Sequence, residues 1–323
     1  MVNMCRTRGP ADIGWDRWFQ ELRALEAAGD GSEDFVDVGP KADSITTPNL
    51  SSPSSDNINH GPMQENVTSQ NLPPPANDEE NKLLDTLRKA AMMDNKTVIV
   101  TTLNAAWTEP NSIFDLFLES FRIGIGTQHL LKHVLVVSLD QKAYSRCLQE
   151  NLHCYALTTE GDADVMWFRD PFERFYPDGD FQIACDHYWF NSTDLNNSPN
   201  GGFNYVKSNN RTIQFYKFWY AGQQYFPGKH DQDVLNMIKF DPFIQRIGLQ
   251  IRFLDTAYFG GFCEPKEDMD LAITMHANCC IGLENKIHDI KIVIDDWKRY
   301  MSLPGGVERN LSSRSWTLPR NCR

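Results

Sequence analysis

Asp162 and Asp164 are the residues whose types and spacing are best suited to chemistry in this sequence. In extended backbone, residues i and i+2 point the same way, so the two carboxylates can converge on one cation. Hard divalent cations prefer oxygen ligands of this kind. A cation held there can bridge the diphosphate of a nucleotide-sugar and neutralise the leaving group. The pair therefore predicts a divalent-metal site.

The Asp-x-Asp pattern alone is a weak indication, because the chain contains four such pairs. One of the others follows Pro177 in a predicted turn, and one opens a predicted helix, where acidic side chains are favoured. The last precedes an apolar run and is consistent with a solvated entry to a strand. The first pair differs because a long apolar, aromatic run follows it at once. The other pairs are Asp178/Asp180, Asp231/Asp233 and Asp268/Asp270.

Length and charge limit the classes to which the chain can belong. At 323 residues it can bury one large core or two small ones. Its net charge of −12 argues against a nucleic-acid partner, which requires a basic surface. No apolar run reaches the roughly 18 residues of a transmembrane span. No apolar segment follows the first residues as it does in a secretory signal.

Composition divides the chain into three parts. Residues 1–80 are predicted to form a separate, stem-like region with a short amphipathic helix at 15–28. Within it, residues 44–80 hold few side chains that offset the entropy of ordering, so we expect a disordered linker. A globular pattern begins near Asn81 and defines a domain at 81–303, which a tail at 304–323 follows.

Strand and helix patterns alternate from this point, in the order β-α-β-α-β. Such an order predicts a parallel sheet with right-handed crossovers. The fold class is therefore α/β, with a mixed, mostly parallel sheet flanked by helices. Strands are predicted at 97–103, 133–139, 153–157, 181–185, 203–206, 251–254 and 272–276. Helices are predicted at 113–121, 141–151, 211–226 and 231–244.

Polar side chains stand at the ends of the first two predicted strands. Open α/β sheets bind ligands beyond the carboxyl ends of their strands. Thr102 and Asn104 lie at such an end and are candidates for nucleotide binding. Asp140 follows the second strand and could reach a base or a ribose. The alternative for all three is formation of the turns at the strand ends.

The cysteines and the glycosylation sequences bear on the cellular compartment in which the protein folds. The eight cysteines contain no C-x2-C pair, so they match no zinc pattern and are either buried thiols or members of one or two disulfides. Whether Cys279 or Cys280 pairs with Cys263 stays open. Asn-x-Ser/Thr sequences matter only in a secreted protein. They start at Asn49, Asn66, Asn95, Asn191, Asn196, Asn210 and Asn310.

Four ordered motifs closely resemble the plant nucleotide-diphospho-sugar transferase family, whose members include rhamnogalacturonan xylosyltransferases and extensin arabinosyltransferases. The motifs are DADVMWFRDPF at 162–172, NGGF at 200–203, HDQDVLN at 230–236 and MHANCC at 275–280. The resemblance covers roughly residues 83–302 and implies a Rossmann-like GT-A fold with a UDP-type nucleotide-sugar donor. It also implies a manganese-type metal, Mn²⁺ or Mg²⁺, and a lumenal position in the Golgi, where the family modifies cell-wall glycans or glycoproteins.

The resemblance assigns one group of residues to the metal and the diphosphate. Asp162 and Asp164 match the metal-binding and diphosphate-binding pair. His276 stands after a late strand, where related enzymes place a third metal ligand, and a structural imidazole is the alternative. Imidazole with two carboxylates suits manganese better than magnesium. Lys286 can pair with the diphosphate or be solvated.

The resemblance assigns a second group to the sugars. Asn200, Gly201 and Gly202 match the loop where backbone approaches the sugars closely, as glycine allows, and a simple tight turn is the alternative. Asp231 and Gln232 match the segment that faces the donor sugar in related enzymes. Helix capping is the alternative for that segment.

The sequence departs from the family just before the Asp-x-Asp motif. A helix and a strand, a few tens of residues in the family, have no counterpart between residues 153–157 and Asp162. The family's membrane anchor is also missing, so we expect a truncated or alternatively spliced form. The absent strand would be central and buried on both faces. Net stability of only ~5–15 kcal/mol would not easily absorb its loss. The strand at 153–157 could instead move into the vacant place.

These observations favour a metal-dependent glycosyltransferase that passes a sugar to a hydroxyl of a glycan or glycoprotein. The main alternative is a catalytically impaired relative that binds a nucleotide-sugar or associates with active homologues. A phosphatase with Asp162 as nucleophile and Asp164 as acid is disfavoured, because it would need an apolar strand directly before Asp162.

Overall fold

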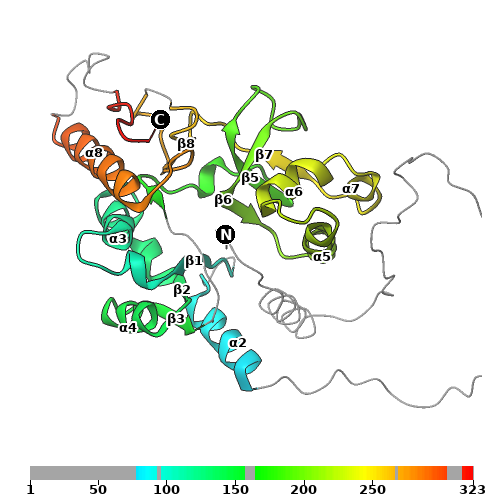
Figure 1. Cartoon of the computed structure of the whole chain (residues 1–323), viewed down its shortest axis with the longest axis horizontal. Coiled ribbons are helices and arrows are strands. Elements are labelled where there is room, and N and C mark those ends of the chain that lie inside the picture. The colour runs from blue at the N-terminus through cyan, green and yellow to red at the C-terminus, as the bar shows by residue number, and fades with distance from the viewer. Residues whose placement is uncertain (1–77, 93–95, 157–163, 266–267, 304–314, 323) are drawn as a thin grey trace, which may run out of the picture.

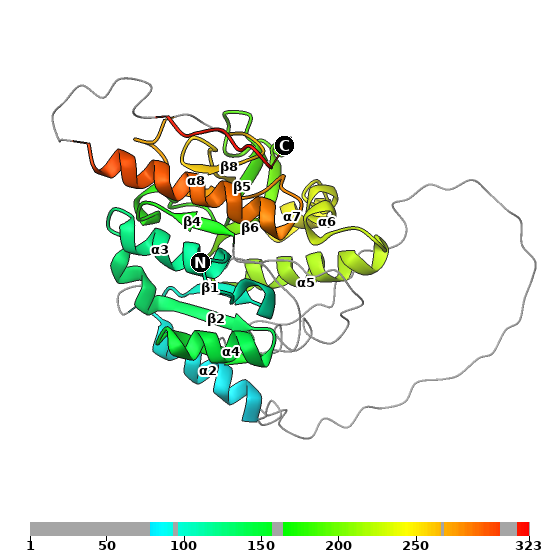
Figure 2. The same cartoon turned by 60° about the vertical axis from the view of Figure 1, so that its left-hand side comes forward.

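The structure, a computed structural model of the whole chain, describes residues 78–92, 96–156, 164–265, 268–303 and 315–322. The predicted helix at 15–28, residues 44–77 of the predicted linker at 44–80, and Asp162 lie outside the described residues. The linker prediction is wrong for residues 78–80, which begin helix α2 (Asp78–Ala90). The fold is mixed α/β, as the sequence predicts. The described residues form three three-stranded sheets, each packed against helices (Figures 1 and 2).

The first sheet has the order β1-β2-β3 and is parallel throughout, which confirms the β-α-β-α-β prediction. Alternate residues of β2 serve its two faces, as the two-residue period of a strand requires. Leu135 and Val137 pack in one cluster with Leu83 of the N-terminal helix, whereas Val134 and Val136 belong to the main core with the crossover helices. The elements are α2 (Asp78–Ala90), β1 (Ile99–Leu103), α3 (Ile113–Ile123), β2 (Val134–Ser138), α4 (Gln141–Gln149) and β3 (His153–Ala156).

The second sheet has the order β6-β5-β7, and its helices share a separate apolar core. The prediction of one continuous helix at 231–244 is wrong, because the structure has two separate helices in this region. Asp241 accepts the N–H of Phe243 and starts a new helix with Pro242 at its first position, where proline's missing N–H costs nothing. The elements are β5 (Phe181–His187), β6 (Ser198–Val206), α5 (Asn210–Tyr225), α6 (Asp231–Ile238), α7 (Pro242–Arg246) and β7 (Ile251–Phe253).

The third sheet, with the order β4-β9-β8, rests against the longest described helix, α8. Strand β4 is tied to α3 because the N–H of Trp167 donates to Ser120 Oγ at 2.9 Å. Trp297 of α8 packs on Phe168 with ring centroids 4.8 Å apart, and Trp316 of the last described segment joins them. The elements are β4 (Val165–Trp167), β8 (Phe259–Gly261), β9 (Thr274–His276) and α8 (Leu283–Met301).

Strand β3 does not fill the place of the absent central strand. It pairs in parallel with β2, and Tyr155 is buried in the cluster under α2. The disulfide between Cys147 and Cys154 also joins β3 to α4. The expectation that residues 153–157 move to the vacant place is therefore wrong. Within the described residues, β1 pairs with β2 alone.

Three disulfides are present in the described part of the chain, one more than the sequence led us to expect. Cys263 pairs with Cys279 and Cys280 pairs with Cys322, which answers the question left open above. Cys185 is a buried free thiol. Among the described residues, none of the helices combines the length and apolar character needed to cross a bilayer.

Candidate active site

Asp164 lies directly before β4 and is completely buried. Its position follows from the antiparallel pairing of β4 with β9, in which Val165 is opposite His276. The carbonyl of Asp164 extends this ladder by accepting the N–H of Ala277 at 3.1 Å. As a result, Oδ1 of Asp164 lies 3.1 Å from Nε2 of His276. The structure thus joins two of the three predicted metal ligands, and the third, Asp162, lies outside the described residues.

Lys286 completes this group from the first turns of α8. Its ammonium donates to Oδ2 of Asp164 at 2.7 Å and lies 6.0 Å from the centroid of the Trp107 ring. Burial would raise the pKa of Asp164, but the charges and hydrogen bonds of His276 and Lys286 hold this pKa well below its usual value. Asp164 is therefore an anionic carboxylate that needs a positive partner.

The surroundings of the His276 ring leave room for the imidazole and leave one of its nitrogens without a partner among the described residues. A Cβ at position 202 would lie only 2.3 Å from Cε1 of His276, so Gly202 is required for the imidazole to fit. Nδ1 of His276 is buried and has no hydrogen-bond partner among the described residues. A buried nitrogen without a partner is costly, and a ligand would relieve that cost. Imidazole and carboxylate are ligand types that Mn²⁺ accepts. Because Nε2 is the ring nitrogen that faces Asp164, a cation shared by the two side chains would replace the contact between Nε2 and Oδ1, and Nδ1 would remain available to a different partner.

Asp186, at the end of β5, is the centre of a second group. Its Oδ1 accepts amide N–H bonds from Asn200 at 2.8 Å and from Asn278 at 2.7 Å, and its Oδ2 accepts one from Gln232 at 2.8 Å. Gln232 in turn accepts the N–H of Gly201 at 3.2 Å. Three amide side chains, from β6, α6 and the segment after β9, are thus held by the one carboxylate at the end of β5.

The sequence interpretation missed Asp186 and Asn278. Asp186 follows the predicted strand 181–185, so the strand-end argument used for Thr102 would have identified it. Asn278 lies within the MHANCC motif, two residues after His276. A Cβ at Gly261 would lie 2.4 Å from Oδ1 of Asn278, so the glycine makes room for this amide.

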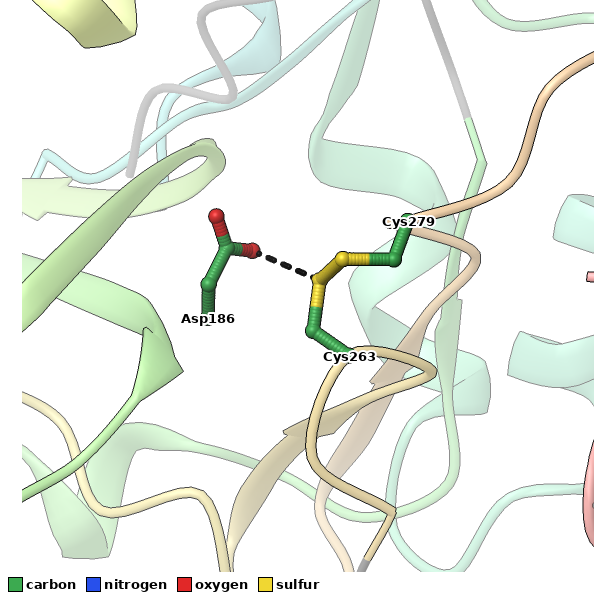
Figure 3. Close-up of side chains that lie close together, drawn as sticks. All are labelled: Asp186, Cys263 and Cys279. Carbon is green, nitrogen blue, oxygen red and sulfur yellow. Dashed lines mark hydrogen bonds between the residues drawn. A yellow bond between two sulfur atoms is a disulfide. The ribbon is translucent and has the colours of Figure 1, made fainter. Parts of the chain in front are cut away.

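Asp186, Cys263 and Cys279 resemble a metal centre, because an oxygen or sulfur atom of each lies within 4.8 Å of the others. Figure 3 shows why they are not one in this structure: the two sulfurs are bonded to each other. Metals bind cysteine as the thiolate, which a disulfide does not offer. Sγ of Cys263 lies 3.1 Å from Oδ1 of Asp186. The disulfide therefore lies against the amide network and joins Cys263 to Cys279, the residue that follows Asn278.

The remaining candidates occupy the edges of this region. Asp140 caps α4 by accepting the N–H of Ala143 at 2.8 Å and also accepts the N–H of Ala105 at 2.6 Å, which supports the turn-forming alternative. Oδ1 of Asn104, after β1, is buried without a hydrogen-bond partner in the described part of the chain. Thr102 is half-buried on the same strand end.

Asp231 stands at the first position of α6, next to Gln232, and the capping roles fall to its neighbours. His230 is the N-cap, and the side chain of Asp233 accepts the N–H of His230 at 3.2 Å. Oδ1 of Asp231 accepts the N–H of Gln232 at 2.9 Å, and its carbonyl accepts Nε1–H of Trp219 at 2.8 Å. These bonds hold the start of α6 beside Asn200. The predictions of a loop or a tight turn at residues 200–202 are wrong, because these residues belong to strand β6.

Two functional parts thus meet through the contact between Gly202 and His276. One presents an anionic carboxylate, an imidazole and an ammonium, which suits a cation and a phosphate group. The other presents backbone and side-chain amides, which suit hydroxyl groups. A family model described as nucleotide-diphospho-sugar transferase matches residues 161–290, a range that contains both parts.

Two proteins of Arabidopsis thaliana are similar over most of their length. One, named Uncharacterized protein At4g15970, is 46% identical over 275 residues, covering 76% of this chain and 74% of the relative. The other, Uncharacterized protein At1g28695, is 35% identical over 263 residues, covering 68% and 79%. The chain belongs to the nucleotide-diphospho-sugar transferase family. No solved structure shows a significant match to this transferase.

Proposed function

We propose that this transferase moves a sugar from a UDP-linked donor to a hydroxyl of a cell-wall glycan or glycoprotein with the help of a divalent metal. One observation carries the proposal: Asp164, which is buried and anionic, is joined to His276 and Lys286 inside the segment that the family model matches. Burial of such a charge is expensive, so a site that retains it has a use for it.

The first part of the site is proposed to bind the nucleoside diphosphate. Asp164 and His276 would hold Mn²⁺ or Mg²⁺, with Asp162 as the further predicted ligand. The cation, when bound, neutralises charge on the departing diphosphate. Lys286 already places an ammonium beside Asp164 and would pair with a phosphate oxygen. Asn104 and Thr102, at the carboxyl end of β1, are proposed to contact the nucleoside.

The second part is proposed to hold the donor sugar. The backbone at Gly201 and Gly202 has no side chain to keep a sugar away. Asn200 and Gln232 are oriented by Asp186, which leaves them little freedom and so reduces the entropy cost of binding. Asp231 remains the candidate carboxylate facing the sugar.

The compartment and the acceptor are proposed from the disulfides and the resemblance. Disulfides such as the three observed persist in oxidising compartments. They support a lumenal position in the Golgi, with the transferase domain at residues 81–303. The similar xylosyltransferases and arabinosyltransferases suggest pectic rhamnogalacturonan or extensin-type glycoproteins as acceptors.

A second function is favoured by one specific observation. β1 pairs only with β2 among the described residues, although the family places a central strand beside it. A sheet without that strand could bind donor but align it poorly for transfer. The alternative is therefore a catalytically impaired transferase that binds a nucleotide-sugar or associates with active homologues.

Isothermal titration of the full chain with UDP, with and without Mn²⁺, tests both functions. We expect binding that requires the metal and that Asp164→Asn abolishes. Subsequent turnover of a UDP-sugar supports the enzyme, whereas metal-dependent binding without turnover supports the impaired relative. Binding that ignores both Mn²⁺ and the substitution would refute the proposed site.

A further inference from the structure

Trp189 and Phe190 stand out among the exposed apolar side chains of the described chain. They are neighbours in the loop between β5 and β6, and they are 60% and 83% exposed. A single exposed apolar residue is ordinary in a folded protein. Two adjacent large aromatic side chains that both face solvent are unusual, because together they leave a large apolar area in water.

The loop that carries them is held firmly from within. Asn197 is completely buried, and its side chain accepts the N–H of Trp189 at 2.7 Å while donating to the carbonyls of Asn191 at 2.7 Å and Asp194 at 2.8 Å. Lys239 donates to the carbonyl of Asn197 at 2.6 Å. The two rings are therefore presented by a preorganised loop, which lowers the entropy cost of binding a partner.

The backbone at Phe190 points to a function for this exposure. Its φ of +59° is in the left-handed region, which bulky side chains rarely adopt. Such conformations persist where the surroundings impose them, and they collect at binding and active sites. Phe190 makes an edge contact with Tyr188, at 6.3 Å between ring centroids, and most of its side chain is exposed.

The loop borders the amide network of the candidate site. His187 pairs with Ser198 at its base, directly beyond Asp186 on one strand and close to Asn200 on the other. Trp189 follows Asp186 by three residues, so their Cα atoms are at most about 10 Å apart. Figures 1 and 2 both place this end of the β5–β6 hairpin beside the β8 segment. The N–H of Tyr188 donates to Glu264, the neighbour of Cys263, at 3.1 Å.

We propose that Trp189 and Phe190 form a stacking platform for a sugar ring of the acceptor glycan. The proposal rests on the proposed function, because it takes the amide network to hold the donor sugar. The C–H groups on one face of a sugar ring carry slight positive charge and are attracted to the negative face of an aromatic ring. The donor is anchored through its diphosphate near Asp164, so the platform beyond Asp186 is left for the acceptor.

A sugar ring could also come from the transferase itself. The sequence Asn191-Ser192-Thr193 starts one residue after the platform and is a glycosylation acceptor sequence. A glycan attached to Asn191 would present the same chemistry to the two rings. The experiment must therefore separate a free acceptor from an attached glycan.

The test uses the full chain produced in plant cells and saturation-transfer NMR with methyl glycosides of fucose, rhamnose, xylose and arabinose. Trp189→Ala and Phe190→Ala are each expected to weaken glycoside binding about tenfold. Tyr225→Ala is the matched control, because Tyr225 is 56% exposed at the end of α5, outside the loop. UDP binding in the presence of Mn²⁺ should be the same in all these variants, as should the thermal unfolding temperature.

Four results would decide the matter. Binding that is lost with Trp189 and kept with Asn191→Gln, which removes an attached glycan, supports an acceptor platform. Binding that is absent from wild type and appears in Asn191→Gln would mean that an attached glycan occupies the rings, and this overturns the proposal, as does equal binding by wild type and Trp189→Ala. Wild type that binds none of the four glycosides overturns it too. Failure of metal-dependent UDP binding would instead refute the proposed function and is measured separately.

Discussion

Asp186→Asn offers the sharpest test of how the site is built, because this carboxylate holds three amides at once. The asparagine keeps one carbonyl oxygen, so the bonds from Asn200 and Asn278 can survive. Its NH₂ group, however, faces the Nε2–H₂ donor of Gln232. Gln232 cannot rotate its amide to relieve this clash without losing the N–H bond that it accepts from Gly201.

The expected cost follows from these bonds. A hydrogen bond to a charged acceptor contributes about 1.5–3 kcal/mol, and a buried donor left unsatisfied costs about as much. We therefore expect a loss of about 2–4 kcal/mol, or about 30-fold to 900-fold. Because Asp186 orients Asn200 and Gln232, this loss should fall on kcat/KM for the UDP-sugar. UDP affinity with Mn²⁺ should change little, since that binding depends on Asp164, His276 and Lys286.

The assay compares turnover of the UDP-sugar with titration of UDP for the wild-type chain, Asp186→Asn and Asp178→Asn. Asp178 is the matched control because its carboxylate is largely exposed and pairs with Arg252 on the surface. Thermal unfolding of each variant shows whether the fold survives. The reasoning is refuted if kcat/KM of Asp186→Asn stays within about threefold of wild type, or if UDP affinity falls as much as turnover.

Three further predictions concern α8 and the segment after it. Lys286→Met should weaken UDP binding in titration about tenfold or more, because a charge-assisted bond is lost. Lys291→Met is the control, because Lys291 is exposed on the same helix, and it should leave UDP binding unchanged. Equal effects of the two substitutions would contradict the role of Lys286. Burial raises the pKa of Asp289, but His288 and the three backbone N–H groups of residues 320–322 outweigh burial, so the net effect is a lowered pKa. The stabilising contribution of this carboxylate is therefore present above its unfolded pKa of about 3.9 and is lost as pH falls through the lower folded pKa. Asp289→Asn should therefore flatten the decline in the free energy of unfolding between about pH 5 and pH 3 in urea titrations, and an unchanged slope would show that this group is not responsible. Removing the Cys280–Cys322 disulfide, whose cysteines are 42 residues apart, by two Ser substitutions should cost about 4 kcal/mol in calorimetry by the chain-entropy relation, and no loss would mean that the bond closes no free loop.

Local pattern was sufficient for the first sheet. The runs that became β1 and β2 are apolar, β-branched and of strand length, so neither needed a distant partner to be recognised. The same procedure missed β4 and β8. Two of the three residues of β8 are glycines, which are depleted in strands, so this segment has little local strand pattern. The missed helix α8 is different. Ile290, Ile294 and Trp297 recur on one face at helical spacing and are buried there, so its pattern was present and was overlooked.

The sequence by itself determined which residue types were available, and its motifs placed Asp164, Gly202 and His276 among the candidates. Only the tertiary structure decided that Asp186 organises the amides and that Cys263 pairs with Cys279. It also decided that Lys286 reaches Asp164 across 122 residues of chain. The physical reason is that a hydrogen bond or disulfide depends on positions in space. Where the chain returns to itself, as β9 does beside β4, those positions follow from strand pairing and core packing, and no local pattern records them.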